Sequence, residues 1–69
     1  MVKDFPDRWF RLKRVRKDGT FFFDKVHNFS DIYGVLGFVY HLARIERECL
    51  ECIVLYDDIT DKQIATFYG

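Results

Sequence analysis

The pair Asp18-Gly19 constrains the fold of this chain most, because it separates two runs of large apolar side chains. Glycine adopts a positive φ without steric cost, and Asp-Gly is typical of a tight turn between two strands. The runs Trp9 to Arg16 and Thr20 to Val26 are rich in the aromatic and β-branched residues that strands favour. The sequence therefore predicts a β-hairpin near the start of the chain.

Two registers of this hairpin are compatible with the sequence. A two-residue turn pairs Val15 with Phe22, whereas a type I turn followed by a glycine bulge pairs Val15 with Phe21. The second register sets Arg11 opposite Lys25, and like charges directly opposite each other destabilise a sheet. We therefore expect the two-residue turn.

A helix follows the hairpin, with Asn28 or Ser30 suited to cap it and an end near Glu48. Its apolar residues recur at helical spacing but cover more than half of its circumference, which is wider than packing on one sheet requires. We therefore expect a second contact on this helix. Its candidate residues flank the apolar stripe: Tyr33, Phe38, Tyr40 and Ile45.

The rest of the chain reads as a second hairpin. Leu50 to Tyr56 and Gln63 to Tyr68 have the composition of strands, and the polar segment from Asp57 to Lys62 suits a turn. The predicted fold is one α+β domain over residues 1–69. It has a four-stranded antiparallel sheet with one helix packed on it, in the order ββαββ.

The chain is unusually aromatic, with eight Phe, four Tyr and one Trp among 69 residues. A large aromatic side chain buries about 150–250 Å², and one sheet with one helix cannot easily hide so many. The surplus predicts an exposed contact surface and favours a homodimer.

The net charge of zero hides an asymmetry along the sequence. Acidic residues gather between Glu46 and Asp61, whereas the first hairpin is basic. The cations that make up this basic hairpin are Arg8, Arg11, Lys13, Arg14, Arg16 and Lys17. Interspersed with Trp9 and Phe10, such residues bind phosphates and bases in nucleic-acid-binding proteins. Two other interpretations are contact with an acidic protein surface and protection of a sheet edge.

Cys49 and Cys52 form a C-x-x-C motif where the predicted helix ends. Redox motifs of this type lie at a helix N-terminus, where the dipole stabilises a thiolate. A structural zinc site needs four ligands, and only His27 and His41 could complete one here. We expect two ordinary thiols, with no metal and no cofactor.

No catalytic motif is present, because the sequence has no glycine-rich phosphate loop and its one serine, Ser30, suits a helix cap. We therefore expect no enzyme activity and no catalytic residues. Residues Met1 to Pro6 do not resemble a signal peptide, and no segment approaches the roughly 20 apolar residues of a membrane span. With only two cysteines, the expected location is the cytoplasm, without a membrane partner.

The hairpin–helix–hairpin plan, the small size and the aromatic surplus resemble small phage and mobile-element proteins that block host machinery, such as anti-CRISPR proteins. The resemblance covers the whole chain as architecture, without a shared motif that would assign roles to residues. It implies a stoichiometric inhibitor or adaptor of a host macromolecule. The sequence thus predicts a protein-binding module that works as a homodimer; the alternative is a nucleic-acid-binding domain that uses the basic hairpin.

Overall fold

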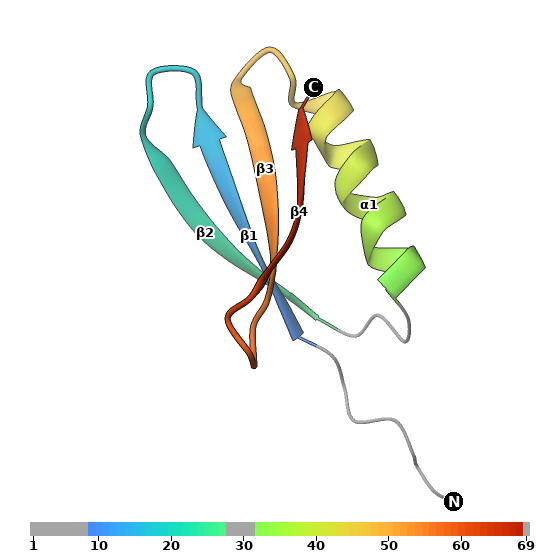
Figure 1. The fold of residues 1–69 in the computed structure, drawn as a ribbon. Helices are drawn as coiled ribbons and strands as arrows, with labels where there is room; N and C mark the ends of the chain where they lie inside the picture. The colour runs from blue at the N-terminus through green and yellow to red at the C-terminus, as the bar shows by residue number, and fades with distance from the viewer. Residues whose placement is uncertain (1–8, 28–31, 69) are drawn as a thin grey trace, which may run out of the picture.

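Four strands and one helix make up the part of the chain that the computed structural model describes, residues 9–27 and 32–68 (Figure 1). In chain order the elements are β1 (Trp9–Arg16), β2 (Phe21–His27), α1 (Ile32–Ile45), β3 (Leu50–Asp57) and β4 (Gln63–Tyr68). The strands form one antiparallel sheet in the order β2-β1-β3-β4. The structure confirms the α+β fold and the order ββαββ.

The core lies between one face of the sheet and the inner stripe of α1. Phe10 and Leu12 of β1 and Ile53 and Leu55 of β3 are completely buried against this stripe. The stripe itself consists of Val35, Val39 and Ala43. The helix packs against β3 and β4. Since successive residues of a strand point to opposite faces, the residues between these four lie on the opposite face of the sheet.

The turn of the first hairpin follows the register that the sequence analysis rejected. The amide of Arg16 donates to the carbonyl of Thr20 over 2.7 Å, and Gly19, with a φ of 95°, donates to the carbonyl of Arg16 over 3.0 Å. Three residues therefore lie in the loop, and Val15 faces Phe21. The expected two-residue turn is wrong.

The objection to this register was the pairing of Arg11 with Lys25, and Asp58 removes it. Arg11 Nε lies 3.2 Å from Asp58 Oδ1, and Lys25 Nζ lies 3.4 Å from Asp58 Oδ2. The carboxylate therefore offsets the repulsion between the two cations. Asp58 is held beside them because its amide donates to the carbonyl of Trp9 over 3.0 Å.

A shift of one residue moves every side chain of β2 to the other face of the sheet. Phe21, Phe23 and Lys25 therefore lie on the face away from the helix, whereas Phe22 and Asp24 lie on the helix side. The expected two-residue turn would instead have placed Phe22 on the face away from the helix.

The helix ends at Ile45, three residues before the predicted end. The amides of Cys49 and Leu50 both donate to the carbonyl of Glu46 over 2.9 Å, which closes a tight turn. The reason is geometric, because the chain must reverse within four residues to begin β3 at Leu50. The predicted caps, Asn28 and Ser30, lie outside the described residues.

Two glycines offer a matched test of this backbone. A Cβ at Gly37 would meet nothing within 4 Å, whereas Gly19 has a φ of 95° that L-residues rarely adopt. We predict that Gly37→Ala raises the free energy of unfolding by about 0.5–1 kcal/mol, because alanine favours the helix. Gly19→Ala should lower it by more than about 1 kcal/mol. Chemical denaturation measures both. A destabilising Gly37→Ala would mean that a second chain packs against this side of the helix.

Asp18 gives the turn a pH dependence. Its carboxylate accepts hydrogen bonds from Thr20 Oγ1 (2.7 Å) and from the Thr20 amide (2.9 Å). These bonds lower the pKa of Asp18 below its ordinary value of 3.8. The resulting stabilisation is complete above that value and is lost as the pH falls through the lowered pKa. We predict that the wild type melts above Asp18→Asn at pH 6 and that the difference shrinks below pH 3.8. An equal difference at both pH values would contradict this.

Candidate binding surface

The face of the sheet opposite the core is named the open face here. It carries alternate residues of each strand: Trp9, Arg11, Lys13, Val15, Phe21, Phe23, Lys25, Cys52, Val54, Tyr56, Thr66 and Tyr68. The single helix packs on the other face. This surface therefore combines aromatic rings, cations and small apolar residues on a rigid four-stranded support.

One end of the open face is apolar. The strand register places four residues in a row across the sheet, in the order Phe21, Val15, Cys52 and Tyr68. Phe21 is 52% exposed and Tyr68 is 67% exposed at the two ends, whereas Cys52 between them is buried. We call these four residues the apolar row. Two exposed rings therefore lie on either side of a less exposed centre.

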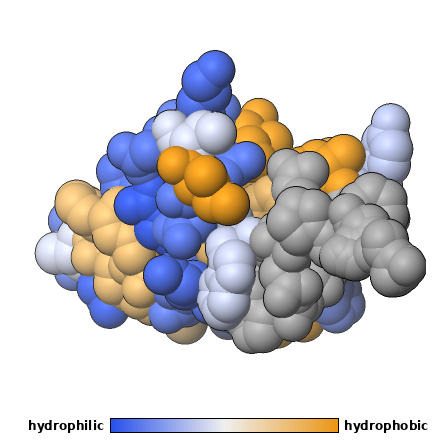
Figure 2. Space-filling model, turned by 90° about the horizontal axis from the view of Figure 1, so that it is seen from below, coloured by the Kyte–Doolittle hydropathy of each residue, from blue (hydrophilic) through white to orange (hydrophobic). Residues whose placement is uncertain are grey.

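Polar and apolar surface also alternate at the opposite end of the molecule. Figure 2 views the end with the β3–β4 turn, where hydrophobic surface lies on both sides of a hydrophilic band. Ile59 of this turn is 75% exposed. The amides of Ile59 and Thr60 donate to Asp57 Oδ1 over 2.9 and 3.2 Å, which fixes the turn.

The predicted helix contact residues are exposed as well. Tyr33, Tyr40 and Ile45 are 53–80% exposed, and Phe38 is 38% exposed. They flank the buried stripe on two different sides, so α1 does not bring them together into one patch. Their role in an interface stays a prediction.

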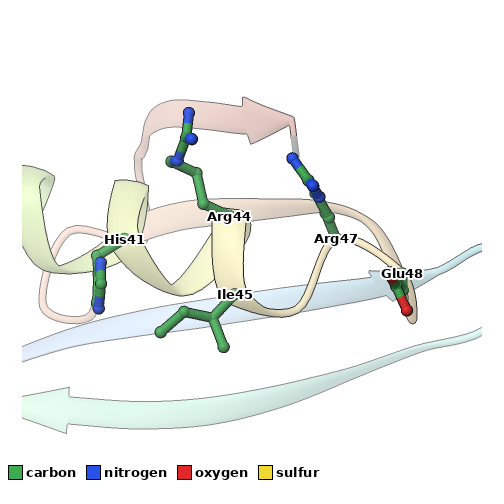
Figure 3. A pocket seen from close by; sticks show the side chains of 5 residues that line it. All are labelled: His41, Arg44, Ile45, Arg47 and Glu48. Atoms are coloured by element: carbon green, nitrogen blue, oxygen red, sulfur yellow. The ribbon is translucent and has the colours of Figure 1, made fainter.

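An open hollow of ≈ 370 Å³ lies at the C-terminal end of α1. It is lined by His41, Arg44, Ile45, Arg47 and Glu48 (Figure 3). Arg44 and Arg47 point toward the β4 side, and Ile45 points toward β1 and β2 (Figure 3). The side chains diverge, so the hollow does not direct several groups at one ligand.

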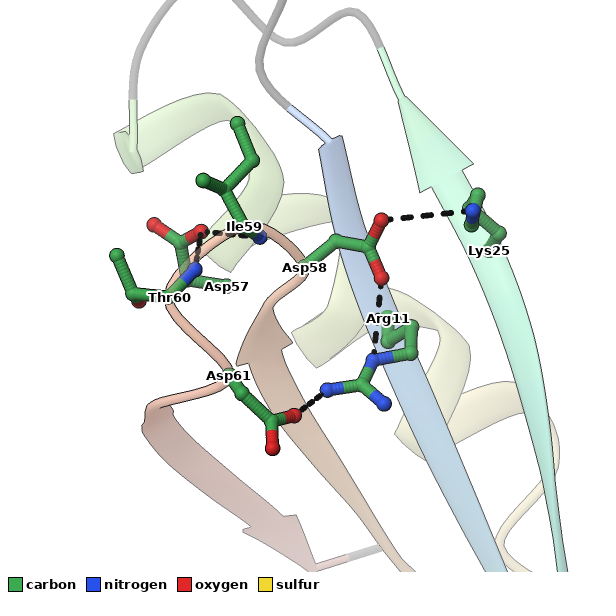
Figure 4. Close-up of polar contacts among 7 residues, drawn as sticks. All are labelled: Arg11, Lys25, Asp57, Asp58, Ile59, Thr60 and Asp61. Carbon is green, nitrogen blue, oxygen red and sulfur yellow. Dashed lines mark hydrogen bonds and ion pairs between the residues drawn. The ribbon is translucent and has the colours of Figure 1, made fainter.

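The other end of the open face is a cluster of paired charges (Figure 4). Arg11 pairs with Asp58 and also with Asp61, both from the β3–β4 turn. Its guanidinium carbon lies 5.5 Å from the ring centre of Phe23 and 5.4 Å from that of Tyr56. Cation–π contacts of this kind contribute about 0.5–1 kcal/mol at exposed sites. The rings are thus held in place by a cation that is itself neutralised.

The basic hairpin does not form one surface. Arg11 and Lys13 lie on the open face, Arg14 and Arg16 lie on the helix side, and Lys17 lies in the turn. Arg8 falls outside the described residues. The strand alternation that the sequence predicted for β1 is the cause, because neighbouring residues of a strand point to opposite faces.

Arg14 is also held by two carboxylates. It pairs with Asp24 of β2, and its Nε donates to Glu46 Oε1 over 3.1 Å. Its side chain is only 15% exposed. Three of the acidic residues between Glu46 and Asp61 therefore pair with the first hairpin, namely Glu46, Asp58 and Asp61. The two charge clusters of the sequence thus meet in part within one chain, through Arg11 and Arg14.

The two cysteines differ in environment. Cys49 is exposed in the turn after α1, and Cys52 is buried on the open face. Burial raises the pKa of the Cys52 thiol above its ordinary value of 9.0, and the charge of Glu51 adds to the rise. A raised pKa keeps the thiol protonated and unreactive. Both cysteines are free thiols.

Two structural findings and a comparison with known proteins bear on the site. Within residues 9–27 and 32–68, no three His, Cys, Asp or Glu side chains gather as a metal site would require. No helix of this part of the chain is long and apolar enough to cross a membrane. The chain matches no model of a known protein family, no curated protein and no solved structure.

We predict that a thiol reagent labels Cys49 quickly and Cys52 only after unfolding. The reason is that Cys49 is exposed, whereas Cys52 is buried with a raised pKa. Mass spectrometry of the labelled peptides measures the two rates.

We also predict that excess EDTA leaves the melting curve unchanged, since we expect no metal site. A structural zinc contributes about 10 kcal/mol or more in small domains, so removing one would lower the melting temperature strongly. A lower melting temperature in EDTA, with Cys49 protected from the reagent, would instead indicate a metal site.

Proposed function

We propose that this chain is a non-catalytic protein-binding module whose contact surface is the open face of its sheet. The observation that carries the proposal is the exposure of its rings: Phe21 is 52%, Phe23 is 47% and Tyr68 is 67% exposed. Leaving apolar rings in water is unfavourable, and a partner that covers them regains that free energy. Aromatic residues and arginine are also the residue types that dominate protein interfaces.

The charges on the open face support a protein partner in particular. Arg11 and Lys25 share Asp58, and Arg11 also pairs with Asp61. Such paired charges resemble the polar rim of a protein interface, whereas a polyanion requires cations that are not already neutralised. A module of this kind acts by occupying its partner, which fits a stoichiometric inhibitor or adaptor of a host macromolecule.

One observation favours the alternative, a nucleic-acid-binding domain. Lys13 and Lys25 lie on the open face among exposed rings, with Lys13 Nζ 4.3 Å from the ring centre of Phe21. Four-stranded sheets with exposed aromatic rings can stack single-stranded bases. A test of nucleic-acid binding should therefore change Lys13 and Lys25, and not all the cations of the basic hairpin. Arg14 is unsuitable for this test, because its partly buried ion pairs would be broken.

A matched pair of tyrosines tests the proposal. Tyr68 on the open face and Tyr33 on the helix are 67% and 80% exposed, so replacing either with serine leaves the core intact. We predict that Tyr68→Ser weakens capture of the partner from host lysate by about 30-fold, the effect of losing about 2 kcal/mol at an interface hot spot. Tyr33→Ser should capture as the wild type does.

The opposite result, with capture lost only in Tyr33→Ser, would place the contact on the helix and refute the proposal. Binding to a single-stranded oligonucleotide at physiological salt is the second readout. Submicromolar binding that falls steeply with salt and disappears in Lys13→Glu with Lys25→Glu would establish the nucleic-acid alternative. Arg16→Glu with Lys17→Glu is the control, because these two residues lie off the open face.

A further inference from the structure

Lys13 lies in the middle of the open face. It belongs to β1, which has a neighbouring strand on both sides, and it is paired with Phe23 of β2 and Val54 of β3. Its side chain is half-buried, and Nζ lies 4.3 Å from the ring centre of Phe21, which is 52% exposed. A partner that covers the ring of Phe21 must therefore cover this ammonium group as well.

The other two strand cations of the open face are already neutralised. Arg11 pairs with Asp58 and with Asp61, and Lys25 shares Asp58. Two carboxylates thus balance two cations. Lys13, by contrast, forms no ion pair within the part of the chain that the structure describes. One positive charge of this face is left unbalanced, and it lies at Lys13.

Two carboxylates that are near Lys13 in the sheet do not balance it. Asp24 lies on the helix side of β2 and pairs with Arg14. Glu51 is the exposed residue that the β1–β3 ladder skips. Among the ion pairs of the described residues, none joins Glu51 to Lys13. The ammonium group of Lys13 therefore relies on water for its stabilisation.

We infer that the open face binds an acidic segment of its protein partner, in which an Asp or Glu between apolar side chains pairs with Lys13. The inference rests on the proposed function and adds the chemistry of the partner. A charge that is removed from water must be paired, because its desolvation is otherwise uncompensated. Since no described carboxylate pairs with Lys13, the partner must supply one.

The surroundings of Lys13 favour a single carboxylate over a chain of phosphates. A nucleic acid is bound by several cations that each neutralise a phosphate, whereas this face has one unbalanced cation. The neighbours of Lys13 on the face are apolar, with Phe21 and Phe23 on β2 and Val54 on β3. Apolar side chains on both sides of the acidic residue would cover these neighbours.

Peptides selected from a random display library are the probe that tests this chemistry. Peptides selected on the purified wild type should bind Tyr68→Ser more weakly and should contain Asp or Glu among apolar residues. One such peptide is then synthesised with its acidic residue changed to the amide. We expect its affinity for the wild type to fall about tenfold and its affinity for Lys13→Met to change by less than about twofold. The reason is that the variant lacks the charge with which the carboxylate pairs.

Lys17→Met is the matched control. Lys17 likewise forms no ion pair among the described residues, but it lies in the turn, off the open face. Changing the acidic residue of the peptide to the amide should therefore weaken its binding to Lys17→Met as much as its binding to the wild type.

The stability of Lys13→Met gives a second readout that needs no partner. Methionine can cover the ring of Phe21 without a charge. If no carboxylate of the chain compensates the charge of Lys13, the melting temperature of Lys13→Met should equal or exceed that of the wild type. Circular dichroism measures both temperatures. A decrease of more than about 5 °C would show that the charge already stabilises the fold, and would overturn the inference.

The binding experiment separates the inference from the proposed function. Peptides that depend on Tyr68 but tolerate the change from acid to amide would overturn the inference and leave the proposed function standing, as would an equal loss in the wild type and Lys13→Met. Peptides that bind Tyr68→Ser as well as the wild type would refute both. Submicromolar binding of a single-stranded oligonucleotide at physiological salt, weakened in Lys13→Met, would assign Lys13 to phosphates and also overturn the inference.

Discussion

The positive φ of Gly19 is the constraint on which the arrangement of this surface depends. It closes a three-residue loop and sets Val15 opposite Phe21. A loop shorter by one residue would send Phe21 and Phe23 toward the helix and bring Phe22 to the open face. The backbone conformation of one glycine thus decides which rings of β2 lie on the helix side and which lie on the open face.

That register is acceptable only because the second hairpin supplies a carboxylate. Arg11 and Lys25 face each other across β1 and β2, and Asp58 lies within 3.4 Å of both. Asp58 reaches them because β3 is the other neighbour of β1 in the sheet. The local turn and the global strand order therefore support each other, which is the consistency expected of a sequence that specifies one fold.

The same dependence explains what the sequence could predict. Local sequence patterns are sufficient to predict strands, turns and the helix, and the structure confirms the predicted element order ββαββ. The hairpin register was mispredicted because its compensating charge, Asp58, is more than 30 residues away in the sequence. The open face was not recognised as a unit, because grouping Phe23 with Tyr56 requires the strand order β2-β1-β3-β4. The basic hairpin does not form one surface, because alternation in β1 divides its cations between the two faces of the sheet.

Helix α1, the one helix in the described part of the chain, covers one face of the sheet, so the proposed contact face must be tolerable in water and also able to bind a partner. Paired charges meet the first requirement, since Asp58 and Asp61 neutralise Arg11 while Arg11 contacts the rings of Phe23 and Tyr56. The same contacts meet the second requirement, because rings held in place lose less conformational freedom when a partner binds.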